Sequence, residues 1–167
     1  MTFLTAYESP IMLLHRLRIE EVDTATILPL RTRGLRPHFS PGELAHFEGD
    51  DDAETHHFAA IDDNAVIAVV TYLPEAMPED RRDAIRLRGM AVAADHRRRG
   101  VGSHLLTTTL SRLPLFFPTT GWVWCNARQS VIPFYEHHGF EPFGQPFSVE
   151  SIGPHQRMRR RLPTAIV

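Results

Sequence analysis

Short apolar segments alternate along this chain with polar turns and with a few segments of helical spacing. Alternating or continuous apolar residues are typical of strands, whereas apolar residues three or four positions apart are typical of helices. We expect strands at residues 12–19, 57–61, 66–73, 85–93 and 122–127, and two more between residues 143 and 162, separated by Gly153 and Pro154. Residues 62–65 should join the second and third strands as a tight hairpin turn.

Helices are expected at residues 20–30, 43–47, 100–113 and 130–139. Because proline lacks an N–H and clashes with the preceding turn, Pro114 should end the third helix. Ser130 should cap the start of the last helix, and Gly139 suits the left-handed position after it. Residues 31–41 should form a loop or a broken helix. The order of elements indicates a mixed α/β sheet rather than a regular array of βαβ units.

Length and composition fit one globular domain. The chain has 167 residues, 43% of them hydrophobic and 23% charged, with a formal net charge of -2. General nucleic-acid and membrane-surface binders are usually basic, and no apolar run approaches the about 20 residues that cross a bilayer. The single cysteine fits a reducing compartment. We therefore expect a cytoplasmic protein with one domain at residues 12–162, a lead-in at 1–11 and a tail at 163–167, and no nucleic-acid or membrane partner.

The most informative segment is LRGMAVAADHRRRGVGSHLL, residues 87–106, in which an apolar strand is followed by three arginines, a glycine pair and a helical segment. The free N–H groups of a helix N terminus favour an anion, glycine lets a ligand approach the backbone, and arginine binds phosphate. The segment predicts a site for a phosphorylated ligand, with a basic surface loop as the alternative. It lacks the lysine of a P-loop and the third glycine of a dinucleotide fingerprint.

This segment resembles the acyl-CoA-binding motif of the GNAT superfamily of N-acetyltransferases, and Arg97, Gly100 and Gly102 fill the motif. A second similarity follows in the family's order and spacing: the asparagine strand that ends at Asn126, and the helix with Phe134-Tyr135 before Gly139-Phe140. The resemblance covers about residues 12–162. It implies a mixed, mostly antiparallel central sheet, splayed at a V-shaped cleft and flanked by helices.

The resemblance also implies acetyl-CoA, or a longer acyl-CoA, as the acyl donor, with no metal. Backbone groups near Met90 and Val92 would pair with the pantetheine, and N–H groups at about residues 98–103 would hold the pyrophosphate. The implied cofactor-binding residues are Met90, Ala91, Val92, Arg97, Arg98, Arg99, Gly100, Val101, Gly102, Ser103 and Asn126. The implied reaction moves an acetyl group to a primary amine by direct attack in a ternary complex.

Tyr135 is the candidate general acid under this resemblance. A leaving thiolate needs a proton or a hydrogen-bond donor, and a phenol with a pKa near about 10 stays protonated at pH 7. A core aromatic beside Phe134 is the alternative interpretation. A positioned neutral amine needs no covalent nucleophile. On an alternating strand Cys125 should point away from Asn126, and thus away from the cofactor.

The acceptor side is less defined. Arg36, which could hold a carboxylate, and His57 and His155 are the candidate substrate residues. Many family members place a glutamate on the central strand, where this chain has Arg86 and Arg88. The general base is therefore open among His57, Glu43, Glu48, Glu75 and His155. The acceptor would be a small-molecule or peptide amine, and a homodimer is one option for the assembly.

Other segments bear on the branch of the family and on rival functions. FEGDDD at residues 47–52, HHF at 56–58 and GPH at 153–155 look similar to an uncharacterised bacterial branch of the family, and the acidic run in the first of these should form a solvated loop. Adjacent histidine pairs point to different sides of a strand or helix, which argues against a metal site. The rivals to an enzyme are a non-catalytic acyl-CoA-binding sensor and a module that binds acidic partners or RNA through the arginines, with steep salt dependence.

Overall fold

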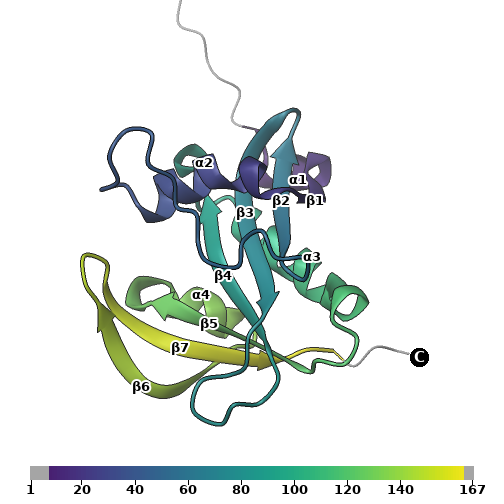
Figure 1. Ribbon diagram of the computed structural model, residues 1–167. Helices are drawn as coiled ribbons and strands as arrows, with labels where there is room; N and C mark the ends of the chain where they lie inside the picture. Colours follow the sequence, from purple (N-terminus) through teal and green to yellow (C-terminus); the bar gives the residue numbers. More distant parts are fainter. Residues whose placement is uncertain (1–7, 164–167) are drawn as a thin grey trace, which may run out of the picture.

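The computed structural model describes residues 8–163, which form one seven-stranded sheet with the strand order β1-β2-β3-β4-β5-β7-β6 (Figure 1). Every neighbouring pair is antiparallel except β4 and β5, which are parallel. The expected mixed, mostly antiparallel sheet is therefore confirmed. The strands are β1 (Arg18–Val22), β2 (His56–Asp62), β3 (Ala65–Pro74), β4 (Ile85–Val92), β5 (Trp122–Arg128), β6 (Glu141–Val149) and β7 (Gly153–Arg161).

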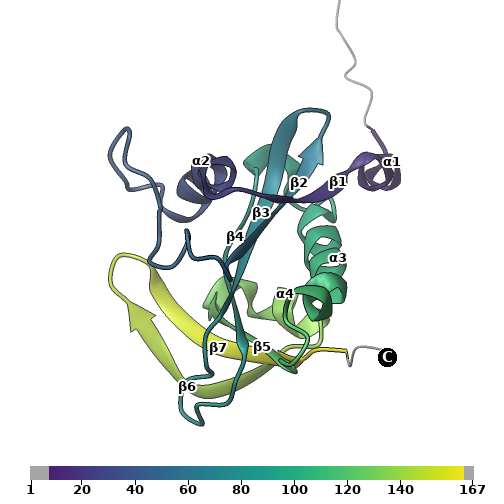
Figure 2. The same ribbon diagram turned by 45° about the vertical axis from the view of Figure 1, so that its right-hand side comes forward.

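Helices cover both faces of the sheet (Figure 2). α2 (Thr24–Leu35) packs on one face, and α1 (Pro10–Arg16), α3 (Val101–Phe116) and α4 (Ile132–His137) belong to the core on the other face. Short 3₁₀ turns, η1 (Ala94–His96) and η2 (Gln129–Val131), precede α3 and α4. Because both faces are covered, β2 and β3 are apolar at successive positions rather than at alternate ones. No helix within residues 8–163 is long and apolar enough to span a membrane.

The N-terminal elements differ from the expectation. The prediction of a strand at residues 12–19 is wrong, because α1 occupies most of these residues and β1 begins only at Arg18. Pro10 fits the first turn of a helix, and Leu13 and Leu17, four positions apart, are both buried. Alternation and helical spacing cannot be told apart over so short a segment. The predicted lead-in thus ends in helix, while residues 1–7, and residues 164–167 of the predicted tail, lie outside the described residues.

The helix boundaries differ as well. α2 begins at Thr24, where the Asp23 carboxylate accepts a hydrogen bond from the Thr26 N–H, and it extends as far as Leu35, into the segment expected as a loop or a broken helix. No helix forms at residues 43–47, and the last helix has Val131 rather than Ser130 as its N-cap. Pro114 does not end α3, which reaches Phe116. Packing of the buried Leu110 and Leu113 outweighs the local cost of this proline.

Two irregularities of β4 open the sheet at its centre. β4 and β5 pair at only two positions, Ile85 with Val123 and Arg86 with Trp124, and beyond Arg86 the two strands diverge. The register of β4 against β3 also shifts between Val69 and Thr71, opposite Gly89, which has a φ of 64°. A bulge of this kind bends a strand and redirects its side chains. The divergence gives the sheet its expected splay.

Candidate active site

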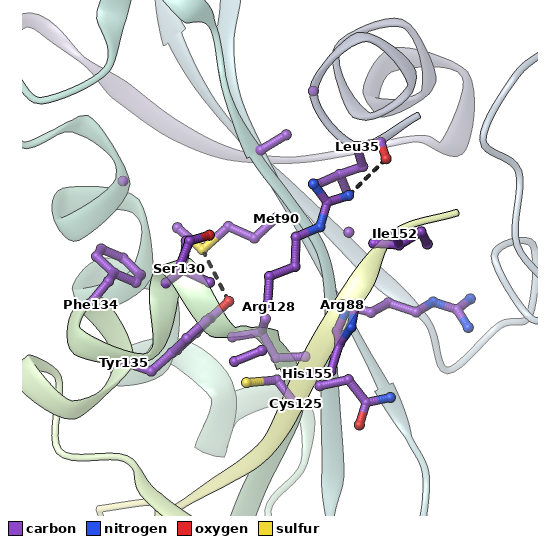
Figure 3. A pocket seen from close by; sticks show the side chains of 18 of the residues that line it. Leu35, Arg88, Met90, Cys125, Arg128, Ser130, Phe134, Tyr135, Ile152 and His155 are labelled. Atoms are coloured by element: carbon purple, nitrogen blue, oxygen red, sulfur yellow. Dashed lines mark hydrogen bonds between the residues drawn. The ribbon is translucent and has the colours of Figure 1, made fainter. Parts of the chain in front are cut away.

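A cavity of about 740 Å³ lies where β4 and β5 diverge (Figure 3). Its walls come from β4 between Arg86 and Val92, the end of β5, the start of α3, and α4. The C-terminal end of α2 and the hairpin between β6 and β7 close the other side. Elements from both halves of the chain therefore meet at one site.

Six of the eleven predicted cofactor residues line this cavity: Met90, Ala91, Val92, Arg97, Gly102 and Asn126. The other five, which do not line it, lie in or next to the first turn of α3: Arg98, Arg99, Gly100, Val101 and Ser103. Val101 is buried in the core, and the Ser103 hydroxyl lies 3.0 Å from Nε2 of His138. Their side chains thus fall outside the cavity, although their backbone forms the turn that borders it.

The N terminus of α3 is open to an anion. Gly100 has a φ of 80° and Arg98 a φ of 60°, so the chain enters the helix through left-handed conformations. No side chain caps this terminus, and the first turn contains no acidic residue. Its N–H groups and the helix dipole are therefore available to a negatively charged ligand.

Gly102 brings the helix close to the strand. A Cβ atom at this position would lie 3.3 Å from Cγ2 of Val92 and 3.6 Å from Cε of Met90. The first turn of α3 thus lies close to the edge of β4, and a side chain at position 102 would push the two apart. On that edge, Arg97 Nε donates a hydrogen bond of 3.1 Å to the Val92 carbonyl oxygen.

Tyr135 is buried, with its hydroxyl directed into the cavity toward Met90 Sδ at 3.9 Å (Figure 3). Phe134 and Phe140 pack against its ring at centroid distances of 5.3 and 5.2 Å. Burial raises the pKa of this phenol well above its ordinary value. The hydroxyl therefore stays protonated over the physiological pH range and can act as a hydrogen-bond donor inside the cavity.

Two neighbouring residues of β5 also line the cavity. Asn126 Oδ1 is buried and has no hydrogen-bond partner within residues 8–163. Buried polar atoms are nearly always paired, so this oxygen fits a ligand that donates a hydrogen bond. Cys125, expected to face away, also lines the cavity, and its side chain is buried in the apolar core. Burial raises the pKa of its thiol, which argues against a thiolate nucleophile.

A buried polar network beside the cavity was missed by the sequence reasoning. Arg31 of α2 is fully buried, and its Nη1 donates to Asp50 Oδ2 at 2.6 Å, while its Nη2 donates to the Thr71 hydroxyl at 2.6 Å. Asp50 also accepts from Arg88 Nη2 at 2.9 Å. The prediction that the acidic run forms a solvated loop is thus wrong at Asp50, which is buried. No local signal connects these residues, which lie 19 to 40 positions apart.

The network also explains the bulge in β4. A Cβ atom at Gly89 would lie 2.6 Å from Arg31 Nε, so only glycine fits over the buried guanidinium. Next to Gly89, Arg88 lines the cavity and bonds both to Asp50 and to the Glu48 carbonyl oxygen at 2.7 Å. The network therefore positions one wall of the cavity.

The three predicted substrate residues do not all lie at the cavity. Arg36 and His155 line the cavity, whereas His57 does not. His57 is buried in the network, with Nδ1 2.7 Å from the Thr71 hydroxyl and Nε2 2.9 Å from the Asp50 carbonyl oxygen. Both of its ring nitrogens are thus engaged. Its pKa is lowered, chiefly by burial.

Among the other candidate bases, Glu43, Glu48 and Glu75 do not line the cavity. The lining residues that were not singled out from the sequence include Arg128, at the end of β5, and Phe47, in the loop after α2. Within residues 8–163 no three His, Cys, Asp or Glu side chains gather as a metal site would require.

Comparisons with known proteins identify the family of this chain. The family model of the acetyltransferase (GNAT) domain matches residues 53–142. The Bacillus subtilis protein YitI, described as an uncharacterized N-acetyltransferase, is 30% identical over 150 residues, which are 89% of this chain and 99% of that protein.

Solved structures share the fold. The crystal structure of Escherichia coli ElaA matches with a TM-score of 0.70 at 18% identity, over 86% of this chain and 99% of that chain. A GNAT family acetyltransferase from Elizabethkingia anophelis, solved with acetyl-CoA bound, matches with a TM-score of 0.63 at 15% identity, over 88% and 99% of the two chains. With the family model and the YitI similarity, these findings show that the chain belongs to the GNAT family of acetyltransferases.

Proposed function

We propose that this acetyltransferase moves an acetyl group from acetyl-CoA to a primary amine by direct attack, with Tyr135 as the general acid. The observation that carries the proposal is the position of the buried Tyr135 hydroxyl in the cavity between the diverging strands, beside Met90 of β4. Acetyl-CoA supplies an acyl group already activated as a thioester. The bound acetyl-CoA of the Elizabethkingia anophelis relative supports this choice of donor.

The residues present fit such a donor. Beyond Arg86, the edge of β4 that faces the cleft has no strand partner, so the backbone near Met90 and Val92 can pair with amide groups of a ligand. The unpartnered Asn126 oxygen can accept another amide N–H. The uncapped N terminus of α3 and the guanidinium of Arg97 supply the positive potential that phosphates need.

Val92 has a second role in this proposal. The Ala93 N–H bonds to the Ile67 carbonyl oxygen of β3 at 2.8 Å. Because successive residues of a strand direct their backbone groups to opposite edges, the Val92 N–H points into the cleft. It can stabilise the negative charge that develops on the acetyl carbonyl oxygen.

Starting from the neutral amine, the chemistry needs two proton transfers. As the amine nitrogen bonds to the acetyl carbon and the carbon–sulfur bond breaks, Tyr135 supplies a proton to the departing sulfur. A base removes the proton that the amine nitrogen loses. The proton taken up by the base and the one given by Tyr135 balance, and no covalent enzyme intermediate forms.

We assign the base to His155. Its Nδ1 lies 2.8 Å from the Gly153 carbonyl oxygen, which can only accept, so in the neutral ring Nδ1 carries the proton and Nε2 the lone pair. Phe147 stacks on the ring at 5.6 Å and helps to fix its orientation. Of the candidate bases from the sequence, His155 alone lines the cavity.

His155→Asn should lower kcat/KM for the amine by about 100-fold at pH 7, because the variant has no basic ring nitrogen. Raising the pH should restore part of the rate, since more of the amine is then neutral and hydroxide can take up the proton that its nitrogen loses. Steady-state kinetics between pH 6 and 10 would check this, with the exposed His15→Asn as the matched control. A rate unchanged by His155→Asn would assign the base elsewhere.

Gly102→Asp should raise the KM for acetyl-CoA by at least about tenfold, because its carboxylate would repel the phosphates at the start of α3 and its Cβ would crowd Val92. An acidic residue in the first turn favours a helix, so the fold should persist. Titration of acetyl-CoA would measure the change. Gly121→Asp is the control, since a Cβ at Gly121 meets nothing within 4 Å. Equal effects of the two substitutions would contradict the site.

The proposed function is tested by thiol release from acetyl-CoA in the presence of a library of amino acids, peptides, polyamines and aminoglycosides. Amine-dependent release of CoA, with the N-acetylated product identified by mass, is the expected result. Acetyl-CoA binding without turnover of any amine would instead indicate the acyl-CoA-binding sensor.

A further inference from the structure

Two arginines meet on the side of the cavity away from α3 and α4. Arg36 follows the last residue of α2, and Arg128 is the last residue of β5. Arg36 Nη1 and Arg128 Nη2 both donate to the carbonyl oxygen of Leu35, at 2.9 and 2.8 Å (Figure 3 shows the bond from Arg128). Both side chains line the cavity, so the structure places two guanidinium groups around one oxygen atom at its wall.

Arg36 and Arg128 differ from the two arginines of β4 in how their positive charges are balanced. Arg86 pairs with Glu75 at 3.0 Å, and Arg88 pairs with Asp50 at 2.9 Å. Within residues 8–163 neither Arg36 nor Arg128 forms an ion pair, and no aspartate or glutamate is among the residues that line the cavity. Burial, followed by the charge of Arg128, lowers the pKa of Arg36.

Two partly buried like charges that share one neutral oxygen favour an anion. Each guanidinium has five N–H donors, and the bond to Leu35 occupies one of them, so donors remain for a ligand. A carboxylate matches the planar guanidinium in shape and charge. The same wall would repel a polycation, for which it offers no acidic partner.

We propose that Arg36 and Arg128 bind a carboxylate of the acceptor, so that the acceptor is an amine that also carries a carboxylate group, as amino acids do. This inference rests on the proposed acetyl transfer. Phe47, Val149 and Ile152 give the surrounding wall apolar contacts, which suit an acceptor with an apolar side group. The carboxylate would fix the orientation of the acceptor while its amine faces the centre of the cavity.

Matched acceptors test the proposal. We would measure kcat/KM with acetyl-CoA for the twenty amino acids, for their α-amides, and for spermidine. The kcat/KM of the best amino acid should exceed that of its own amide, and that of spermidine, by at least about tenfold. The reason is that neither the amide nor spermidine has a carboxylate that can form charged hydrogen bonds with the arginines. Arg36→Gln and Arg128→Gln should each remove most of this preference without raising the KM for acetyl-CoA. Arg33→Gln, which changes an exposed arginine in the last turn of α2 that does not line the cavity, should leave both constants unchanged.

Binding of products separates this inference from the proposed function. With CoA present, calorimetry should show N-acetyl amino acids binding at least about tenfold more tightly than their amides, and Arg36→Gln should abolish the difference. That result supports the carboxylate site even if no amine is turned over. Turnover of amides or spermidine as fast as of amino acids would overturn the site and leave acetyl transfer intact. A higher KM for acetyl-CoA in Arg36→Gln would also overturn it, because the arginine would then serve the donor.

Discussion

Tyr135→Phe is expected to lower kcat by about 100-fold to 10,000-fold while the KM for acetyl-CoA changes far less. The substitution removes one oxygen atom and leaves the ring between Phe134 and Phe140. The loss should therefore appear in the step that expels the thiolate rather than in binding of the donor. Steady-state kinetics with saturating and limiting acetyl-CoA, using the best amine from the library, would measure both constants.

Tyr72→Phe is the matched control. Tyr72 is also a fully buried tyrosine, but its hydroxyl lies 2.7 Å from that of Thr109 and the residue does not line the cavity. Its substitution should cost about 1 kcal/mol of stability and leave kcat near that of the parent chain. A Tyr135→Phe variant as active as Tyr72→Phe would show that Tyr135 is a core aromatic and not an acid.

The raised pKa of Tyr135 sets the pH dependence of this contribution. Because burial disfavours the phenolate, deprotonation of this group should reduce kcat only above about pH 10, the ordinary pKa of tyrosine. Profiles of kcat against pH for the parent chain and for Tyr135→Phe would therefore run parallel from neutral pH to about pH 10. If the ratio of kcat in the parent chain to kcat in Tyr135→Phe fell near neutral pH, the group that titrates there would be one other than Tyr135.

Asp50→Ala is expected to destabilise the fold by about 3–5 kcal/mol. Asp50 accepts hydrogen bonds from Arg31, Arg88 and the Phe47 N–H, and without its carboxylate the fully buried Arg31 guanidinium has no counter-charge. Urea unfolding would measure the change, with the exposed Asp52→Ala in the same loop as the control. A loss below about 1 kcal/mol would mean that the network adds little to stability.

The pH dependence of this contribution has a definite sign. Burial raises the pKa of Asp50, but hydrogen bonds from Arg31 and Phe47 outweigh burial, so that the folded-state pKa lies below the ordinary value. A carboxyl group with a lowered pKa stabilises the fold above its unfolded pKa of about 3.9, and the stabilisation is lost as the pH falls through the folded value. The difference in stability between the parent chain and Asp50→Ala should thus be constant near pH 7 and shrink below about pH 4.

The sequence predicted best those features that depend on neighbouring residues. The strand that ends at Val92, the Arg97–Gly102 turn and the helix after it lie within one short segment, and each is specified by local chemistry. The boundaries of α2 and α3 were missed because tertiary packing keeps Pro29 and Pro114 inside these helices.

The wall that we assign to the acceptor was predicted only in part, because it is assembled from distant segments: Arg36 and His155 were candidates from the sequence, and Arg128 was not. Arg36 and Arg128 share the oxygen of Leu35, although Leu35 and Arg128 lie 93 positions apart in the sequence. The acidic loop likewise has a solvated composition, and only the buried Arg31 explains why Asp50 turns inward. Contacts of this kind leave no periodic signal in a single sequence.

The short pairing between β4 and β5 has a consequence for motion. The two halves of the sheet share one apolar core, but they share backbone pairing only at Ile85–Val123 and Arg86–Trp124, so we expect each half to exchange its amide hydrogens as a separate unit. A donor bound between the strands would contact both units and add the missing bridge. The exchange rates of the amide hydrogens of β4 and of β5 should then fall together when the donor binds. Binding at this site would thus make the whole sheet more rigid.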